Sequence, residues 1–111
     1  MKKKDCIFCR IINGEIPKEF AYEDDAVVAF DDLNPLAKIH LLVIPKTHVE
    51  DFFDQKNEKI HMAIVKALHH LIEMQGLMGK GYKVEVNGGG FQVVPHLHFH
   101  LIGPTGVSLK N

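Results

Sequence analysis

Short runs of apolar and β-branched residues divide this chain into candidate strands. Each run is bounded by Asp, Asn, Gly or Pro, the residues that favour turns and cannot continue a strand ladder easily. We assign strands to residues 20–23, 26–31, 39–45, 82–87 and 95–103. In the last of these, polar and apolar residues alternate strictly, which predicts a half-buried strand with one wet face and one face in the core.

Two other segments repeat their apolar residues with the helical period. Residues 5–14 predict a short helix, with Asp5 as its N-cap and Gly14 as its stop. After a polar lead-in, residues 60–77 place apolar side chains every three or four positions, which predicts a helix of about five turns that Gly76 helps to end. Because short turns join the strands, we expect an α+β fold: an antiparallel sheet of about five strands with one short N-terminal helix and one long helix.

Composition limits the classes of protein to consider. At 111 residues we expect a single domain spanning 1–111, and a net charge of −1 gives no reason to expect a nucleic-acid surface. No apolar run is long enough to cross a membrane, and Asp5 interrupts any secretory leader, so we expect a cytoplasmic protein. In that compartment the two cysteines are not expected to form a structural disulfide.

The alternating strand carries the clearest chemical signal. His96, His98 and His100 fall on one face, while the residues between them point into the core. Same-face neighbours lie about 6.6 Å apart at Cα and the outer pair about 13 Å, so the three rings cannot easily share one ion. We therefore expect three different roles, drawn from those open to imidazole: ligand, general base, nucleophile or phosphate partner.

Three further features leave alternatives open. Cys6 and Cys9 form a C-x-x-C pair that could grip a metal or act as a redox dithiol, although no strand leads into it as a redox motif would require. Asp31 and Asp32 follow a strand and could bind hydroxyl groups, or could simply make a turn. The glycines at 88–90 could cradle a phosphate or form a plain hairpin loop. The helix histidines at 61, 69 and 70 are expected to be surface or interface residues.

Several blocks of this sequence, in the right order, resemble one known family. The string His96-Leu97-His98-Phe99-His100-Leu101-Ile102 resembles the H-φ-H-φ-H-φ-φ signature of the histidine triad (HIT) family. Residues 6–17, 29–35 and 40–48 resemble the opening and middle blocks of its nucleotide-binding, Hint-like branch. The resemblance covers nearly the whole chain and so implies a HIT-like fold.

The resemblance also implies an activity. It implies a homodimer formed through the long helices and a continuous sheet, a purine nucleotide substrate, and hydrolysis or transfer at the α-phosphate. The matching catalytic positions are His96, His98 and His100, with His98 as the nucleophile. The positions matching nucleotide-binding residues are Ile7, Phe8, Ile11, Phe30 and Leu33 around the base, Asp32 at the ribose, and Asn87, Gln92 and His100 around the phosphate.

The same resemblance implies a structural zinc ion and no organic cofactor. Cys6, Cys9, His48 and His96 would make a closed Cys₂His₂ set. The alternative is that the two cysteines are packed free thiols.

The leading functional hypothesis is a nucleotidyl hydrolase that cleaves purine nucleoside 5′-phosphoramidates or related mixed anhydrides through a nucleotidyl-histidine. The alternatives are dinucleoside polyphosphate hydrolysis and a zinc-stabilised nucleotide-binding module with little turnover. Val93 stands where the family often has serine near the leaving group, which favours the module slightly because valine donates no hydrogen bond. The sequence leaves the choice between adenine and guanine open.

Overall fold

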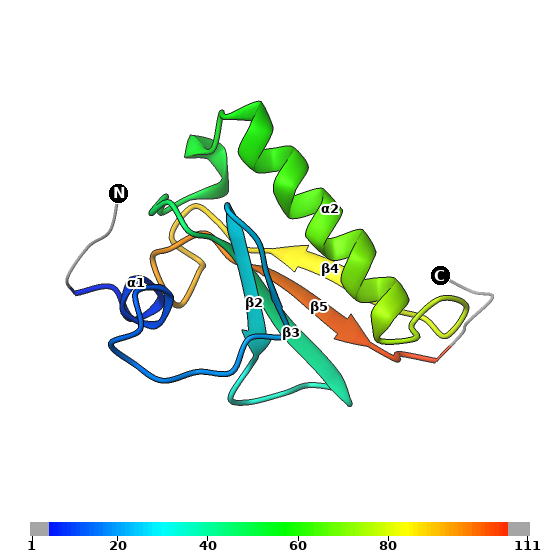
Figure 1. Ribbon diagram of the computed structural model, residues 1–111. Helices are drawn as coiled ribbons and strands as arrows, with labels where there is room; N and C mark the ends of the chain where they lie inside the picture. Colours follow the sequence, from blue (N-terminus) through cyan, green and yellow to red (C-terminus); the bar gives the residue numbers. More distant parts are fainter. Residues whose placement is uncertain (1–4, 107–111) are drawn as a thin grey trace.

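Five antiparallel strands form one sheet, with a long helix on one side (Figure 1). The computed structural model describes residues 5–106. The elements in chain order are α1 (Ile7–Ile12), β1 (Tyr22–Glu23), β2 (Val27–Asp31), β3 (Ile39–Pro45), the 3₁₀ helix η1 (Phe52–Asp54), α2 (Glu58–Met74), β4 (Lys83–Val86) and β5 (Phe99–Gly103). The strand order is β1-β2-β3-β5-β4. The α+β fold expected from the sequence is therefore confirmed.

The sheet is covered on both faces near its centre. On one face, Leu41 and Val43 of β3 pack with Ile64 and Leu71 of α2. On the other face, a second buried cluster joins β2 and β3 to α1; it contains Phe8, Cys9, Ile11, Val28, Phe30, Leu42 and Ile44. Because successive strand residues point to opposite faces, burial on both sides explains why β3 reads as one apolar run. The second face carries the candidate site.

The helix boundaries differ in part from the sequence prediction. Cys6, not Asp5, caps α1: its Sγ accepts the Cys9 N–H at 3.3 Å. Gly14 has a φ of +87° after the helix, in the left-handed region where glycine is favoured, as expected of a stop. The long helix is capped by Asn57 and ends at Met74, three residues before the predicted end at Leu77.

The histidine segment departs most clearly from the prediction. β5 begins only at Phe99, so His96 and His98 precede the strand instead of lying on it. The predicted wet face is also wrong, since His96 is 0% exposed and His98 6%. The Leu97 N–H donates to the Val49 carbonyl at 2.6 Å, which holds this stretch against the loop after β3. On the side where solvent was expected, the two histidines are covered by Phe8 of α1, by the two cysteines and by His48.

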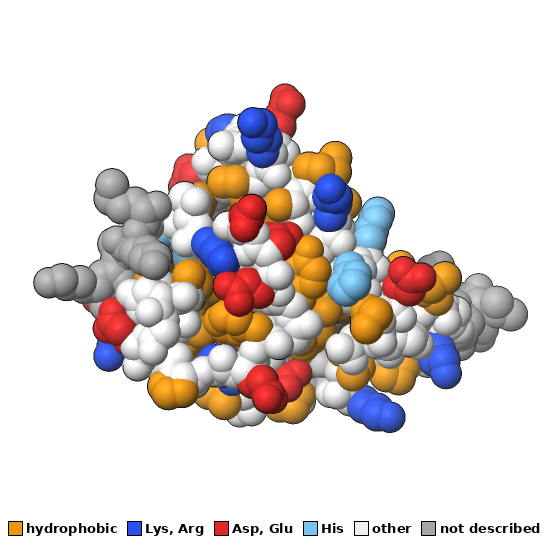
Figure 2. All heavy atoms as spheres, in the orientation of Figure 1, with side chains coloured by type: hydrophobic (Ala, Val, Ile, Leu, Met, Phe, Trp, Pro, Cys, Tyr) orange, Lys and Arg blue, Asp and Glu red, His pale blue; other side chains and the backbone are white. Residues whose placement is uncertain are grey.

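The surface has no dominant charge on the face seen in Figure 2, where lysine and arginine side chains are dispersed among acidic ones. Within residues 5–106, no helix is both long enough and apolar enough to cross a membrane.

Candidate functional site

A cavity of about 460 Å³ opens on the α1 face of the sheet, with a wall that changes character along its length. Phe8 and Ile11 of α1 and Phe30 of β2 supply an apolar end, whereas His98 and His100 supply a polar end. The remaining lining residues are Ile7, Lys18, Asp31, Asp32, Leu33, Asn34, Leu36, His40, Leu42, Asn87, Val93 and Val94. Such a site can hold a flat apolar group and an anionic group side by side.

His98 presents one nitrogen to this cavity and uses the other internally. Its Nδ1 lies 2.8 Å from the His96 carbonyl oxygen. A carbonyl only accepts hydrogen bonds, so Nδ1 carries the proton and Nε2 keeps its lone pair. The ring packs edge-on against Phe8, with centroids 5.2 Å apart. The neutral ring of His98 is thus held in the tautomer that leaves Nε2 able to attack an electrophile.

His100 belongs to a second chain of polar contacts, which runs through His40 in β3. The Leu36 N–H donates to His40 Nδ1 at 3.1 Å, so the neutral His40 ring carries its proton on Nε2. His40 Nε2 then donates to His100 Nδ1 at 2.9 Å. The proton of the neutral His100 ring must therefore sit on Nε2, where it can be donated.

The pKa of His100 supports the neutral form. Burial, together with the nearby rings of His98 and His40, lowers this pKa from its ordinary value, and the Asp32 carboxylate opposes the shift. Asp32 Oδ2 lies 3.4 Å from His40 Nε2 and 3.9 Å from His100 Nδ1. Its Oδ1 accepts the Asn34 N–H at 2.9 Å, which fixes the carboxylate at the edge of the cavity.

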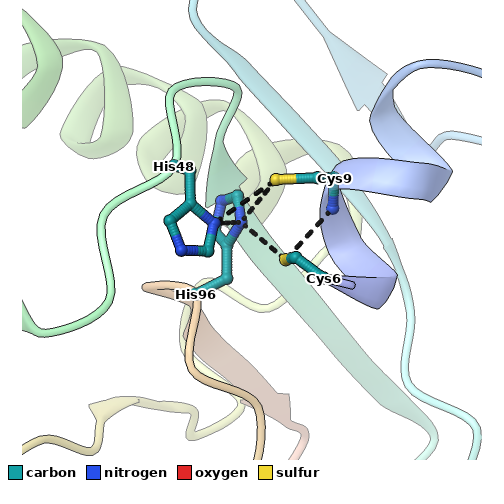
Figure 3. Close-up of side chains that lie close together, drawn as sticks. All are labelled: Cys6, Cys9, His48 and His96. Atoms are coloured by element: carbon teal, nitrogen blue, oxygen red, sulfur yellow. Dashed lines mark hydrogen bonds between the residues drawn. The ribbon is translucent and has the colours of Figure 1, made fainter. Parts of the chain in front are cut away.

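Four sulfur and nitrogen atoms converge beside the start of α1 (Figure 3). The Sγ atoms of Cys6 and Cys9 and the Nδ1 atoms of His48 and His96 all lie within 4.8 Å of one another. Cys6 Sγ is 3.3 Å from His96 Nδ1, Cys9 Sγ is 3.3 Å from His48 Nδ1, and the two Nδ1 atoms are 3.2 Å apart. A tetrahedral zinc ion would set such separations at about 3.3–3.8 Å. The four residues can therefore hold a metal ion.

Local chemistry also fits a metal. His96 Nε2 donates to the Pro45 carbonyl at 2.9 Å, which leaves Nδ1 without a proton and aimed at the thiols. Burial lowers the pKa of His96 to about 4, so its ring is neutral at neutral pH, as a ligand must be. Burial raises the pKa of the Cys6 thiol, a cost that a bound cation would offset.

The positions that the sequence marked for nucleotide binding gather around the cavity, with one exception. Ile7, Phe8, Ile11, Phe30, Asp32, Leu33, Asn87 and His100 all line it. Gln92 does not; its Oε1 accepts the Gly90 N–H at 3.0 Å and its Nε2 donates to the Glu50 carbonyl at 2.9 Å. The Gly89 N–H donates to Asp51 at 2.8 Å. The N–H groups of Gly89 and Gly90, considered for a phosphate, are thus already bonded to the side chains of Asp51 and Gln92.

Among the cavity residues that sequence reasoning did not single out, two carry ionisable side chains, His40 and Lys18. His40 lies within an apolar run, and only its histidine partner sixty residues later reveals its place. Lys18 comes from the loop between α1 and β1, where nothing in the local pattern marks it. The helix histidines lie apart from both sites: among the described residues, none of His61, His69 and His70 belongs to a candidate metal group.

Comparison with known sequences gives consistent relatives. The HIT domain family matches residues 13–107 of this chain. An uncharacterized HIT-like protein of Methanocaldococcus jannaschii is 43% identical over 100 residues, which cover 87% of this chain and 77% of that protein. A 14 kDa zinc-binding protein of Brassica juncea is 40% identical over 106 residues, covering 89% of this chain and 92% of that protein.

Solved structures show the same fold. A histidine triad protein from Clostridium difficile superposes with a TM-score of 0.89 at 40% identity, covering 100% of both chains. A HIT family hydrolase from Clostridium thermocellum gives 0.87 at 38% identity, covering 97% of this chain and 99% of that one. A histidine triad nucleotide-binding protein from Candida albicans gives 0.81 at 36% identity, covering 87% and 73% of the two chains.

Proposed function

This chain belongs to the HIT domain family, and from that premise we propose that it is a nucleotidyl hydrolase or transferase of adenosine 5′-monophosphoramidase type. Its substrates would be purine nucleoside 5′-phosphoramidates or related mixed anhydrides, cleaved at the α-phosphorus. One observation carries the proposal: the 2.8 Å hydrogen bond from His98 Nδ1 to the His96 carbonyl, which leaves Nε2 bare at a cavity with an apolar end. Solved relatives named as a hydrolase and as a nucleotide-binding protein support it.

The cavity offers a place for each part of a nucleotide. A purine would lie between Phe8, Ile11 and Phe30, where ring contacts and burial of apolar area favour a flat heterocycle. The Asp32 carboxylate would accept hydrogen bonds from the ribose hydroxyls. The α-phosphate would then lie before His98 and His100, within reach of both Nε2 atoms.

The first step would form a covalent intermediate. The His98 Nε2 lone pair attacks the α-phosphorus, the P–N bond of the phosphoramidate breaks, and its electron pair leaves with the amine, which takes a proton from water. The His100 Nε2–H donates to a phosphoryl oxygen and stabilises the negative charge that builds up there. Water then attacks the phosphorus, releases the nucleoside monophosphate and a proton, and restores the lone pair of His98.

Turnover of an adenosine phosphoramidate by the wild type and by His98→Ala tests this mechanism. The wild type should release AMP and the variant should not, while His69→Ala on the exposed side of α2 should match the wild type. AMP release that survives His98→Ala would exclude the mechanism. Feeding diadenosine polyphosphate to the same proteins distinguishes the two enzyme hypotheses, and nucleotide binding without turnover would favour the binding module.

We propose that the metal held by Cys6, Cys9, His48 and His96 is zinc, in a structural role. A closed set of two sulfurs and two nitrogens is typical of structural zinc. The name of the Brassica juncea relative supports this choice. The ion would fasten α1, which carries one wall of the cavity, to the segment that carries His98. Metal analysis of protein prepared without chelators should find about one zinc per chain.

We also propose that the protein is a cytoplasmic homodimer. β4 lies at the edge of the sheet, and Val84 in it is 41% exposed. On α2, Met62 and Val65 are 58% and 41% exposed. Exposed apolar side chains on a helix next to an open strand edge favour pairing of two copies through both elements. Light scattering on the purified chain should give twice the mass of 12.5 kDa.

A further inference from the structure

Lys18 is the one lysine or arginine among the described residues that line the cavity. Its Nζ lies over the ring of Phe30, 5.5 Å from the centroid, within the range of a cation–π contact. Among residues 5–106 its ammonium makes no ion pair. The side chain is only half-buried, so its three N–H donors remain available to a ligand.

The contact with Phe30 places this cation at the apolar end of the cavity. The ring of Phe8 lies 5.2 Å from that of His98 and 5.8 Å from that of Phe30. The ammonium of Lys18 contacts Phe30 at this end of the cavity. A base packed against the phenyl rings would therefore present an edge close to the ammonium.

We propose that Lys18 reads the base and makes this chain prefer 6-oxopurine nucleotides, those of guanine and hypoxanthine, over adenine nucleotides. The proposal rests on the proposed nucleotidyl hydrolase function and adds its substrate class. A lysine ammonium only donates hydrogen bonds. Guanine offers two acceptors on one edge, O6 and N7, whereas adenine presents N7 beside the N6 amino group, which is a donor. The same ammonium thus attracts the first edge and is repelled by part of the second.

Binding of GMP, IMP and AMP to the full chain, measured by calorimetry, tests this choice. The wild type should bind GMP and IMP about tenfold more tightly than AMP, the lower end of what a base-reading contact gives. Lys18→Met keeps the length of the side chain but not the charge, and should bring the three affinities together mainly by weakening GMP and IMP. Lys18→Arg, which restores the donors, should restore the preference. Lys38→Met, an exposed lysine outside the cavity lining, should leave it unchanged.

Four outcomes would overturn the inference while nucleotide binding itself stands. The wild type could bind the three nucleotides equally, or Lys18→Met could keep the preference. Lys18→Met could also weaken all three to the same degree, which would place the ammonium on the phosphate. If IMP binds like AMP while GMP binds tightly, the 2-amino group is being read instead, and Lys18 is not the reader. Absence of binding by all three nucleotides would remove the proposed function together with this inference.

Discussion

His96 and His98 are two residues apart, yet the fold prepares them for opposite chemistry. His96 donates from Nε2 to the Pro45 carbonyl and turns a bare Nδ1 toward two thiols. His98 donates from Nδ1 to the His96 carbonyl and turns a bare Nε2 toward the cavity. The side chains are chemically identical, so the position of one backbone carbonyl decides whether the ring is suited to bind a metal or to attack phosphorus.

The two rings also differ in their access to solvent and ligands. His96 is completely buried among the sulfur atoms and His48, so a bound cation could be enclosed on all sides. His98 lies at the cavity wall, where a substrate can reach it. The group formed by Cys6, Cys9, His48 and His96 thus suits a structural role, and the cavity suits turnover. Each of the following experiments disturbs one of these two sites and leaves the other intact.

The largest effect is expected from His98→Asn. The asparagine amide can still donate to the His96 carbonyl, so the fold is kept, but no nitrogen lone pair remains to attack phosphorus. Single-turnover release of AMP should fall about 10⁴-fold, while metal content and thermal midpoint stay at wild-type values. A rate within about tenfold of the wild type would show that another group is the nucleophile.

Cys9→Ser replaces one of the two thiols that lie beside His96. Serine is a poor zinc ligand, and Cys9 is fully buried, so we expect loss of the metal and about 3 kcal/mol of folding stability. For a domain of this size the thermal midpoint should fall by about 10 °C or more. Elemental analysis and calorimetry measure both effects.

Turnover provides the control for Cys9→Ser. Well below the lowered midpoint the variant should keep turnover within about tenfold of the wild type, since His98 is retained. An unchanged midpoint in this variant would mean that the cysteines are merely packed thiols.

A smaller catalytic loss is expected from His40→Phe. Without the Nε2–H of His40, the proton of His100 is no longer held on the nitrogen that faces the cavity. In serine proteases, kcat falls strongly when the catalytic histidine is held in the wrong tautomer. For His40→Phe we expect about a 10²-fold loss in kcat. His40→Gln, whose amide can still donate to His100, should recover much of the rate. If both variants match a His69→Phe control, the contact between the two rings has no part in turnover.

The order of elements followed from sequence pattern because local periodicity reflects which face of each element is buried. The apolar run at residues 39–45, bounded by turn residues, predicts a buried strand, and β3 has these bounds in the structure. The five strands and two helices came from the same signals. The C-x-x-C pair and the histidine string pointed to the metal set only because a family resemblance joined them.

The features that the sequence pattern did not predict depend on contacts between residues far apart in the chain. Alternation at residues 95–103 predicted a strand throughout, but an extended segment can alternate without a ladder, and here Leu97 bonds to Val49 in a loop. The partnership of His40 and His100 follows from strand register: His40 lies opposite Ile102, which puts it diagonally next to His100 on the same face. The cap of α1 was assigned to Asp5 on propensity, whereas the thiol of Cys6 takes that position.

The smallest expected effect concerns the pH dependence of stability. Because burial lowers the pKa of His100 in the folded chain, the unfolded chain binds a proton more readily below its ordinary pKa of 6.5. The stabilisation is therefore complete above that pH and is lost as the pH falls below it. Urea midpoints of the wild type should drop more between about pH 7.5 and 5.5 than those of His100→Gln, which cannot titrate there.

The difference between the two proteins in that experiment should be less than about 1 kcal/mol, since Asp32 and Glu85 oppose the shift and the His100 side chain is partly exposed to solvent. Any metal lost from Cys6, Cys9, His48 and His96 in acid would be lost by the wild type and His100→Gln alike, because His100 is not one of these four residues, and so would cancel in the comparison. A wild type that gains stability toward acid relative to His100→Gln would mean that Asp32 holds His100 as a cation. The neutral Nε2–H donor would then be the wrong description of the cavity's polar end, while the nitrogen of His96 that faces the two thiols would be unaffected.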